Sequence, residues 1–319
     1  LKASFQLREG MIDDSAETIK KVIALEPINF GRRGSSVQIL LRQGLKDEAR
    51  EVLDNAVEQM PDSIEAKVAK IELVRKLDGQ AEAEKALQQM IDNAPKVHEL
   101  RFVMARLYES AGKDTDAEAV FRELISIGAA NETALQARAR LAQLLAKQQK
   151  YDEALAQLEA VLAEKADHSD ALVLRGNVHL VRQDYAKAIE DYRTVLRDKP
   201  NSVKALRFLA KAQALSGDAA SAKRNYQLVI ENEPTLKEAY VELAQLLVRL
   251  KDLQGATKVL EQALRIDPKQ LPVLDLVSKL YLQLKHVEGV KNSSQRLMAA
   301  FQSSPLGYYY HGMALLLEK

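Results

Sequence analysis

The stretch "DYAKAIEDYRTVLRDKPNS" (residues 184–202) carries an alanine, a tyrosine and a proline at Ala188, Tyr192 and Pro200. The stretch "DAASAKRNYQLVIENEPTL" (residues 218–236) repeats the three residue types with the same spacing, at Ala222, Tyr226 and Pro234. Self-similarity at a fixed period of this length is typical of arrays in which each unit is one supersecondary element. Such a unit cannot bury its apolar faces alone, so its neighbours must stack on it.

The repeat extends along most of the chain. An alanine in the middle of the unit recurs at Ala49, Ala83, Ala117, Ala154, Ala188, Ala222 and Ala256. All of these steps are equal except the one from Ala117 to Ala154, which is longer by three positions. The long step predicts three extra residues near "IGAAN" (127–131), a turn-like stretch. Prolines follow the same interval, at Pro27, Pro61, Pro95, Pro200, Pro234 and Pro268.

Each unit is predicted to contain two antiparallel helices. In "ALRFLAKAQAL" (205–215) apolar residues stand three and four apart, and "SAKRNYQLVI" (221–230) repeats this after a break at Gly217. This is the 3.6-residue period of an amphipathic helix. A second small residue lies twelve positions before the alanines from Ala117 to Ala256, and the same register continues one repeat further; small residues at both places let the paired helices approach closely. These residues are Ala105, Ala142, Gly176, Ala210, Ala244 and Ser278.

Residues at the helix ends fit this pattern. Thr235 with Glu238 and Asp62 with Glu65 have the spacing of a capping box and are predicted to start first helices. The prolines follow the second helix, where the chain must leave the helical conformation. The segment "EGVKNSS" (288–294) departs from the pattern and predicts a weak second helix in the last unit.

The pattern resembles the tetratricopeptide repeat, a 34-residue unit with small residues at its eighth and twentieth positions. That family also places a large residue at the twenty-fourth position and a proline at the thirty-second. Gly176, Ala188, Tyr192 and Pro200 fill these four places in one unit, whereas the early tryptophan of the family is absent. The resemblance implies an all-α fold, an α-solenoid (a right-handed superhelix) of stacked antiparallel helix-turn-helix repeats.

The register divides the chain into three parts. We expect a partial repeat, mainly its second helix, in residues 1–29, then eight units, then the first helix of a truncated further repeat in 305–319. The eight units are 30–63, 64–97, 98–134 with the three-residue insertion, 135–168, 169–202, 203–236, 237–270 and 271–304. Both ends lie inside helical pattern, so we expect a fragment of a longer protein.

Composition excludes several function classes. The chain has 46 basic and 45 acidic residues, which gives no strong electrostatic footprint for nucleic acid. It has no cysteine, which excludes disulfides, thiolate metal sites and cysteine catalysis. The longest apolar runs are too short to span a bilayer.

Motifs for catalysis, metals or cofactors are missing. The five histidines form no HExxH motif, and neither GxxxxGK[ST] nor GxGxxG occurs. We therefore predict no enzyme activity, no metal and no cofactor. The aromatic stretch "GYYYHG" (307–312) is predicted to open the last helix, with Gly312 at the small position, Tyr308 packing and Tyr309 facing the groove.

The resemblance implies a concave groove, lined by the first helices, that binds protein or peptide ligands. Positions two, five, nine, twelve and thirteen of those helices commonly touch ligands in the family. The candidate groove residues are Phe102, Arg106, Val173, Asn177, Lys204, Arg207, Lys211, Val241 and Gln245. Lys204, Arg207 and Lys211 form a basic stripe, which Glu238 and Glu242 of the next unit could neutralise in part.

One known mode of recognition is absent. Co-chaperones of the large heat-shock proteins hold a C-terminal carboxylate with lysine and asparagine at positions five and nine. Here Val173 precedes Asn177, and the next unit has Phe208 where asparagine is required. The following unit has Glu238 and Glu242 in place of basic residues.

The leading hypothesis is a non-enzymatic scaffold that binds protein partners along this groove. Similarity to the tetratricopeptide segments of bacterial exopolysaccharide synthesis and export machines favours the periplasm or envelope over the cytoplasm. Three alternatives stay open: a cytoplasmic adaptor or chaperone-like protein for assembly or regulation, an enzyme domain fused to the array, and a self-assembling array that associates through exposed terminal repeats.

Overall fold

The computed structural model describes residues 30–128 and 131–318, and every regular element in these ranges is an α-helix. The partial repeat predicted in residues 1–29 lies outside the described residues. The chain divides into two compact units, Leu1–Leu144 and Leu145–Lys319, which are described separately.

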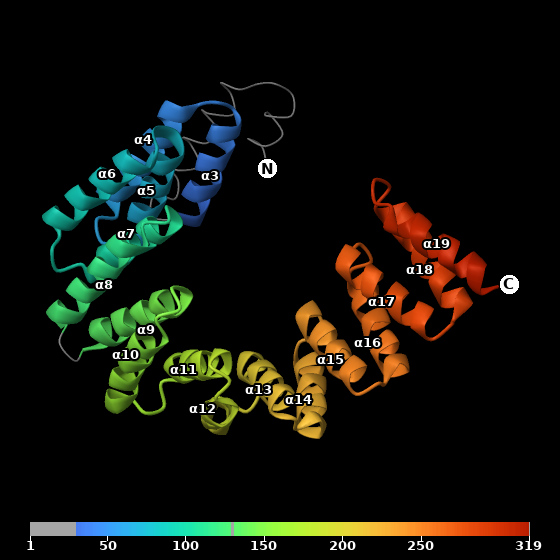
Figure 1. Cartoon of the computed structure of the whole chain (residues 1–319). Helices are drawn as coiled ribbons and strands as arrows, with labels where there is room; N and C mark the ends of the chain where they lie inside the picture. The colour runs from blue at the N-terminus through green and yellow to red at the C-terminus, as the bar shows by residue number, and fades with distance from the viewer. Residues whose placement is uncertain (1–29, 129–130, 319) are drawn as a thin grey trace. The chain divides into compact units, whose positions relative to one another are not determined.

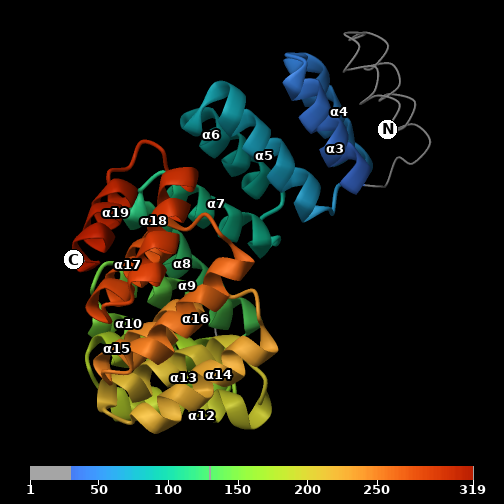
Figure 2. The ribbon, with the colours of Figure 1, turned by 90° about the vertical axis from the view of Figure 1, so that its right-hand side faces the viewer.

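The first unit is a series of helix hairpins. Its helices are α3 (Phe30–Arg42), α4 (Lys46–Gln59), α5 (Ile64–Asp78), α6 (Gln80–Asn93), α7 (His98–Ser110), α8 (Asp114–Gly128) and most of α9 (Glu132–Lys147). Each helix from α3 to α7 packs against the next one in the chain. Both the α3–α4 and the α5–α6 hairpins have their two helices side by side (Figure 1, Figure 2).

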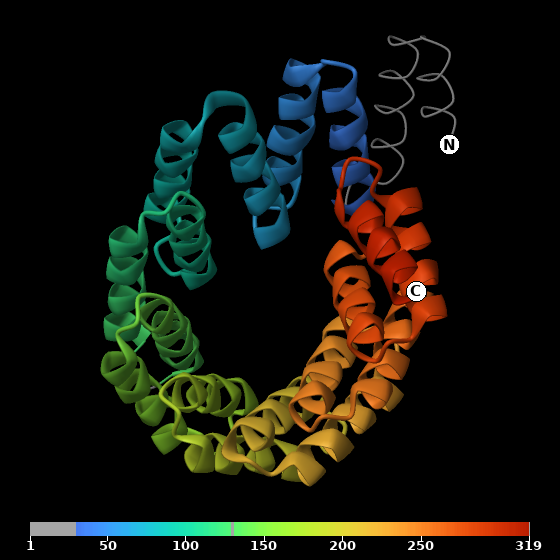
Figure 3. The ribbon, with the colours of Figure 1, turned by 45° about the vertical axis from the view of Figure 1, so that its right-hand side comes forward.

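The second unit continues the same architecture. Its helices are α10 (Tyr151–Glu164), α11 (Ser169–Val181), α12 (Tyr185–Asp198), α13 (Val203–Ser216), α14 (Ala219–Asn232), α15 (Lys237–Arg249), α16 (Leu253–Ile266), α17 (Leu271–Gln283), α18 (Val287–Ala300) and α19 (Leu306–Leu317). Each helix packs on its successor (Figure 3). First helices also contact first helices, as α13 does with α11 and α15. The all-α repeat-solenoid class predicted from the sequence is confirmed.

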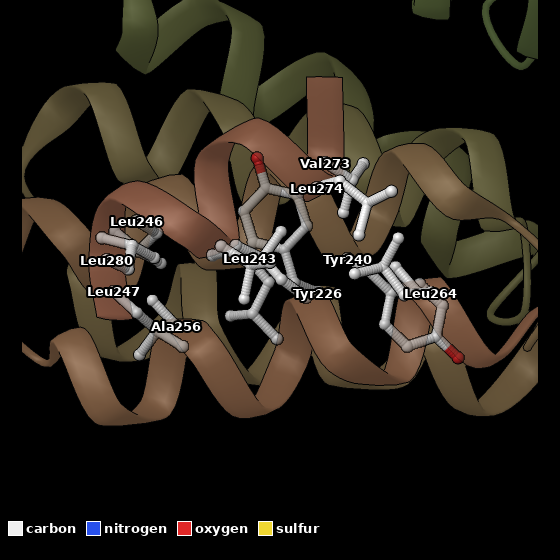
Figure 4. Packing of buried hydrophobic residues seen from close by; sticks show 14 of the residues in the cluster. Tyr226, Tyr240, Leu243, Leu246, Leu247, Ala256, Leu264, Val273, Leu274 and Leu280 are labelled. Carbon is white, nitrogen blue, oxygen red and sulfur yellow. The ribbon is translucent and has the colours of Figure 1, made fainter. Parts of the chain in front are cut away.

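Buried side chains run through the second unit from hairpin to hairpin. One cluster joins residues of α13 to α19, among them Tyr226, Leu243 and Leu274 (Figure 4). Tyr310 of α19 belongs to the same cluster. Burial of each large apolar side chain contributes about 1.5–3 kcal/mol to folding. The hairpins therefore stabilise one another, as expected of units that cannot bury both faces alone.

Helix ends follow the sequence in part. Pro200 and Pro234 come shortly after the ends of α12 and α14, where helices stop as predicted. The predicted capping residues are wrong by one position. Ser63, not Asp62, caps α5 by accepting a hydrogen bond from the backbone N–H of Ala66, and no side chain caps α15, whose preceding residue is Leu236.

The last hairpin contradicts the prediction of a weak second helix. Residues 288–294 lie inside the continuous helix α18. Ser293 and Ser294 in this stretch are buried, and their hydroxyls donate to the carbonyls of Val290 and Lys291. Ser278 of α17 also donates to the Ser293 hydroxyl at 2.8 Å. Packing against the neighbouring helix thus overrides the low helix propensity of the segment.

The tyrosine that is buried in helix α19 is not the one that was predicted. Tyr310 is 1% exposed, and its hydroxyl donates to the Asp275 carboxylate at 2.6 Å. Tyr308, which was predicted to pack, is 66% exposed. Gly312 has no atom within 4 Å of the place where its β-carbon would be. Tyr308 therefore does not take the predicted packing role in the described part of the chain.

Candidate functional site

A pocket of about 450 Å³ lies between three first helices of the second unit. We call it the α13–α15 pocket. Its lining residues are Lys211, Ala214 and Leu215 of α13, Tyr226 of α14, Glu242, Gln245, Val248 and Arg249 of α15, and Leu276 of α17. This volume lies within the range of pockets that bind small ligands.

The repeat register explains why these side chains meet. Lys211 and Gln245 are one repeat length apart and occupy the same position in α13 and α15, two helices that contact each other. Successive first helices therefore present equivalent faces in the same direction. Tyr226 lies on the intervening helix α14, where its ring packs in the core between them (Figure 4).

An ion pair lies at the edge of the pocket. Arg207 of α13 donates from Nε and Nη2 to the two carboxylate oxygens of Glu242, at 2.9 and 2.8 Å. The hydrogen bond to this carboxylate raises the pKa of the Arg207 guanidinium above its ordinary value. Bidentate pairing of this kind is stronger than a single charged contact. The neutralisation of the basic stripe by Glu242 is therefore present, and it involves Arg207.

Several hydrogen-bond donors of the pocket remain unengaged. The exposed side chains of Lys211 and Arg249 form no ion pair or hydrogen bond with any described residue. The Tyr226 hydroxyl also has no hydrogen-bond partner among the described residues. Burial and the nearby Glu242 carboxylate raise the pKa of Tyr226, so its hydroxyl stays protonated at neutral pH. The pocket is consequently rich in donors, while its one acid already has a partner.

The preceding repeat is arranged differently. Tyr192 occupies the place of Tyr226 one repeat earlier, and its hydroxyl donates to Asn177 Oδ1 at 2.8 Å. The ring of Tyr192 stacks on Phe208 with centroids 5.9 Å apart. Val173 is only 4% exposed and belongs to the core cluster of α11–α13. Val173 therefore packs in the core, which corrects its prediction as a groove residue, and the Asn177 side-chain oxygen accepts from Tyr192 within the protein.

The other predicted groove residues do not lie in one place. Lys211 and Gln245 line the α13–α15 pocket. Arg207 lies beside it, and the exposed Lys204 and half-buried Val241 share its helices without lining it. Phe102 and Arg106 lie on α7 in the first unit, where the Phe102 ring is 6.4 Å from that of Phe121.

Sequence reasoning missed four lining residues for which a signal existed. Ala214, Leu215, Val248 and Arg249 occupy the twelfth and thirteenth positions of their repeats, two of the positions that commonly touch ligands in the resembled family. Tyr226, which the repeat places at the position of the large residue, contributes to both the core and the pocket.

A second pocket, also of about 450 Å³, lies between α6, α7 and α8 in the first unit. Its cation, Arg101, donates to the Glu123 carboxylate and to the Pro95 carbonyl, both at 2.8 Å. Because this charge is satisfied internally, the α13–α15 pocket is the stronger candidate for binding a charged ligand.

Within the described ranges, no group of three or more histidine, aspartate or glutamate side chains is placed to hold a metal ion. The same part of the chain has no helix of the length and hydropathy needed to cross a membrane.

Comparison with known proteins identifies a family. One tetratricopeptide repeat model matches residues 75–132, 139–203 and 177–235, and a second matches residues 214–280, together more than half of the chain. No curated protein sequence matches significantly.

Solved structures agree at the level of the fold. A tetratricopeptide repeat protein from Parabacteroides merdae is 18% identical with a TM-score of 0.56, and the match covers 79% of this chain and 98% of that one. The C-terminal part of a repeat protein from Cytophaga hutchinsonii is 14% identical with a TM-score of 0.59, covering 76% and 99%. A monomeric mutant of IFIT1, solved with m7Gppp-AAAA, is 14% identical with a TM-score of 0.64, covering 99% and 79%.

Proposed function

The chain belongs to the tetratricopeptide repeat family, and we propose that it is a non-enzymatic scaffold that binds a peptide segment of a partner protein at the α13–α15 pocket. Proteins of this family are generally protein-interaction scaffolds. The observation that carries the proposal is the set of unengaged donors in a pocket between first helices. Apolar walls with a few polar groups are the usual composition of a recognition site.

The lining residues suit a peptide. Leu215 is 42% exposed at the pocket, and Val248 and Leu276 are half-buried, which leaves apolar surface for a partner side chain. Gln245 is exposed and supplies an amide that can pair with a peptide backbone. A few such anchors dominate binding at most protein interfaces.

The context of the scaffold is part of the proposal. We place it in a bacterial envelope complex for exopolysaccharide synthesis or export, on the resemblance of the repeat array alone. The alternative is a cytoplasmic adaptor or chaperone-like protein for assembly or regulation. The two contexts differ in the partners they supply, so the experiment that identifies a partner also decides between them.

The test is a pull-down from envelope and cytosol fractions, with residues 1–319 as bait and mass spectrometry as the readout. Gln245→Trp places a large ring at the mouth of the pocket without changing its charge, and the matched control Gln262→Trp changes an exposed glutamine of α16. We expect partners that the control retains and Gln245→Trp loses. Equal recovery with both baits would show that the pocket is not the binding site.

The identity of those partners decides the context. Enrichment of polysaccharide-pathway proteins from the envelope fraction supports the export complex. Enrichment of cytosolic clients alone supports the adaptor and removes the export proposal.

A further inference from the structure

The charges around the α13–α15 pocket are unbalanced in a way that indicates the chemistry of its ligand. Lys211 and Arg249 line the pocket as cations without partners among the described residues. Glu242 is the one acid among the lining residues, and both of its carboxylate oxygens accept from Arg207. The pocket therefore carries two uncompensated positive charges.

The neutral polar groups add to this preference. The Tyr226 hydroxyl is protonated at neutral pH and, among the described residues, has no acceptor. In the preceding repeat the equivalent hydroxyl, on Tyr192, is satisfied by Asn177. One repeat later, Lys211 takes the position of Asn177, and the lysine ammonium cannot accept a hydrogen bond. The Tyr226 hydroxyl is therefore available to donate to an acceptor on a ligand.

Apolar surface lies directly beside these donors. Ala214 and Leu215 of α13, Val248 of α15 and Leu276 of α17 contribute to the same cavity. A group that satisfied only the charges would leave this surface in water. Burying this surface against an apolar side chain of a ligand is favourable.

We propose that the α13–α15 pocket selects a peptide segment in which an aspartate or glutamate side chain stands beside a large apolar side chain. The carboxylate accepts hydrogen bonds from Lys211, Arg249 and the Tyr226 hydroxyl, and the apolar side chain lies against Leu215, Val248 and Leu276. This inference rests on the proposed function, because it names the ligand of the same pocket.

The inference is tested by selecting dodecapeptides from a random phage library on the whole 1–319 chain. Peptides that also bind Gln245→Trp are discarded, and the remainder are synthesised with amidated C-termini, so that only side chains supply a carboxylate. Each is measured in its native form and with its acidic residue replaced by the amide. Fluorescence anisotropy gives the Kd.

The decisive variant is Lys211→Glu/Arg249→Glu. Its matched control, Lys258→Glu/Arg265→Glu, reverses one lysine and one arginine that are exposed on α16 and do not line the pocket. We expect the pocket variant to lose at least about tenfold in affinity, because that is the contribution of one hydrogen bond to a charged group. The control is expected to bind within about twofold of the unmodified chain, since distant surface charges are largely screened.

Two further results complete the comparison. Replacing the peptide acid by its amide should cost a similar factor on the unmodified chain and little on the pocket variant, because the two changes remove the same contact. Selected peptides without an acidic residue, or equal affinities for the pocket variant and its control, would overturn the inference and leave the peptide scaffold standing. Failure to select any peptide that Gln245→Trp blocks would overturn the proposed function as well.

Discussion

A β-carbon on Gly176 would lie 2.6 Å from Cε1 of Tyr192. The eighth and twenty-fourth positions of this repeat are thus in direct contact, with the absence of a side chain at one accommodating the ring of the other. Gly312 holds the same position in α19, four repeat lengths later, and has nothing within 4 Å. The same residue type therefore has a packing role in one helix and none in the other.

This difference predicts that replacing glycine by alanine has different effects on stability at Gly176 and at Gly312. Gly176→Ala should lower the free energy of unfolding by about 1–3 kcal/mol, because the ring of Tyr192 must move in a packed core. Gly312→Ala should leave it unchanged or raise it by up to about 1 kcal/mol through helix propensity. Urea denaturation followed by circular dichroism measures both. Equal effects of the two substitutions would contradict the packing assignment.

The two repeat tyrosines should respond differently to loss of the hydroxyl. Tyr192→Phe removes the hydrogen bond to Asn177 Oδ1 and is expected to lower the free energy of unfolding by about 1 kcal/mol. Tyr226→Phe removes a hydroxyl without a described protein partner, so its effect on stability should be much smaller. It should instead weaken the binding of acidic peptides selected on the pocket. A larger stability loss for Tyr226→Phe would show that its hydroxyl is satisfied inside the protein.

The ion pair at the pocket edge predicts changes of opposite sign. Glu242→Gln removes the carboxylate that holds Arg207 and should destabilise the chain by about 1 kcal/mol. It should also strengthen the binding of acidic peptides severalfold, because the single acid of the pocket is gone and a third cation is released.

The control for this prediction is Glu261→Gln. Glu261 accepts from Arg296 at 2.9 Å, and the pair does not line the pocket. We expect a similar loss of stability with unchanged peptide affinity. Weaker peptide binding to Glu242→Gln would argue that Glu242 itself contacts the ligand.

A buried histidine gives the second unit a predicted pH dependence. His179 of α11 is 8% exposed, and burial lowers the pKa of its imidazole below the ordinary 6.5. Among its charged neighbours Asp191 and Asp184 oppose this shift, while Lys187 and Arg175 reinforce it.

The sign follows from the neutral form being favoured in the folded state. As the pH falls, the imidazole of His179 takes up a proton in the unfolded chain before it does so in the folded chain. The contribution of this group to the free energy of unfolding is therefore complete above about pH 6.5 and is lost as the pH falls below that value. His179→Gln should reduce the loss of urea midpoint between about pH 7.5 and pH 5.5. Parallel pH profiles for the two proteins would refute the assignment to His179.

Much of the fold could be predicted from the sequence, because hairpin packing depends on residue size at fixed intervals. Gly176 was predicted from spacing to let the paired helices approach closely, and the ring of Tyr192 on the paired helix lies directly against it. Helix ends and the course of residues 288–294 were less predictable, since they depend on local hydrogen bonds such as those of Ser63 and Ser293.

The site was predictable only in part. The register placed Lys211 and Gln245 on equivalent faces, and both line the pocket. The register could not show that Val173 is buried or that the Tyr192 hydroxyl donates to Asn177. Both depend on side-chain packing between helices. Whether a charged side chain on a helix face is free or paired also depends on the side chains of the neighbouring helix.

The central claim is that a partner segment binds in the α13–α15 pocket, and crosslinking tests it most directly. Because the chain has no cysteine, Gln245→Cys creates a unique attachment point with a side chain smaller than glutamine, and Gln262→Cys provides the same on α16. We predict that a selected acidic peptide carrying a terminal chloroacetyl group crosslinks to the cysteine at 245 and not to the cysteine at 262. Crosslinking at 262 alone, or equally at both positions, would contradict the account.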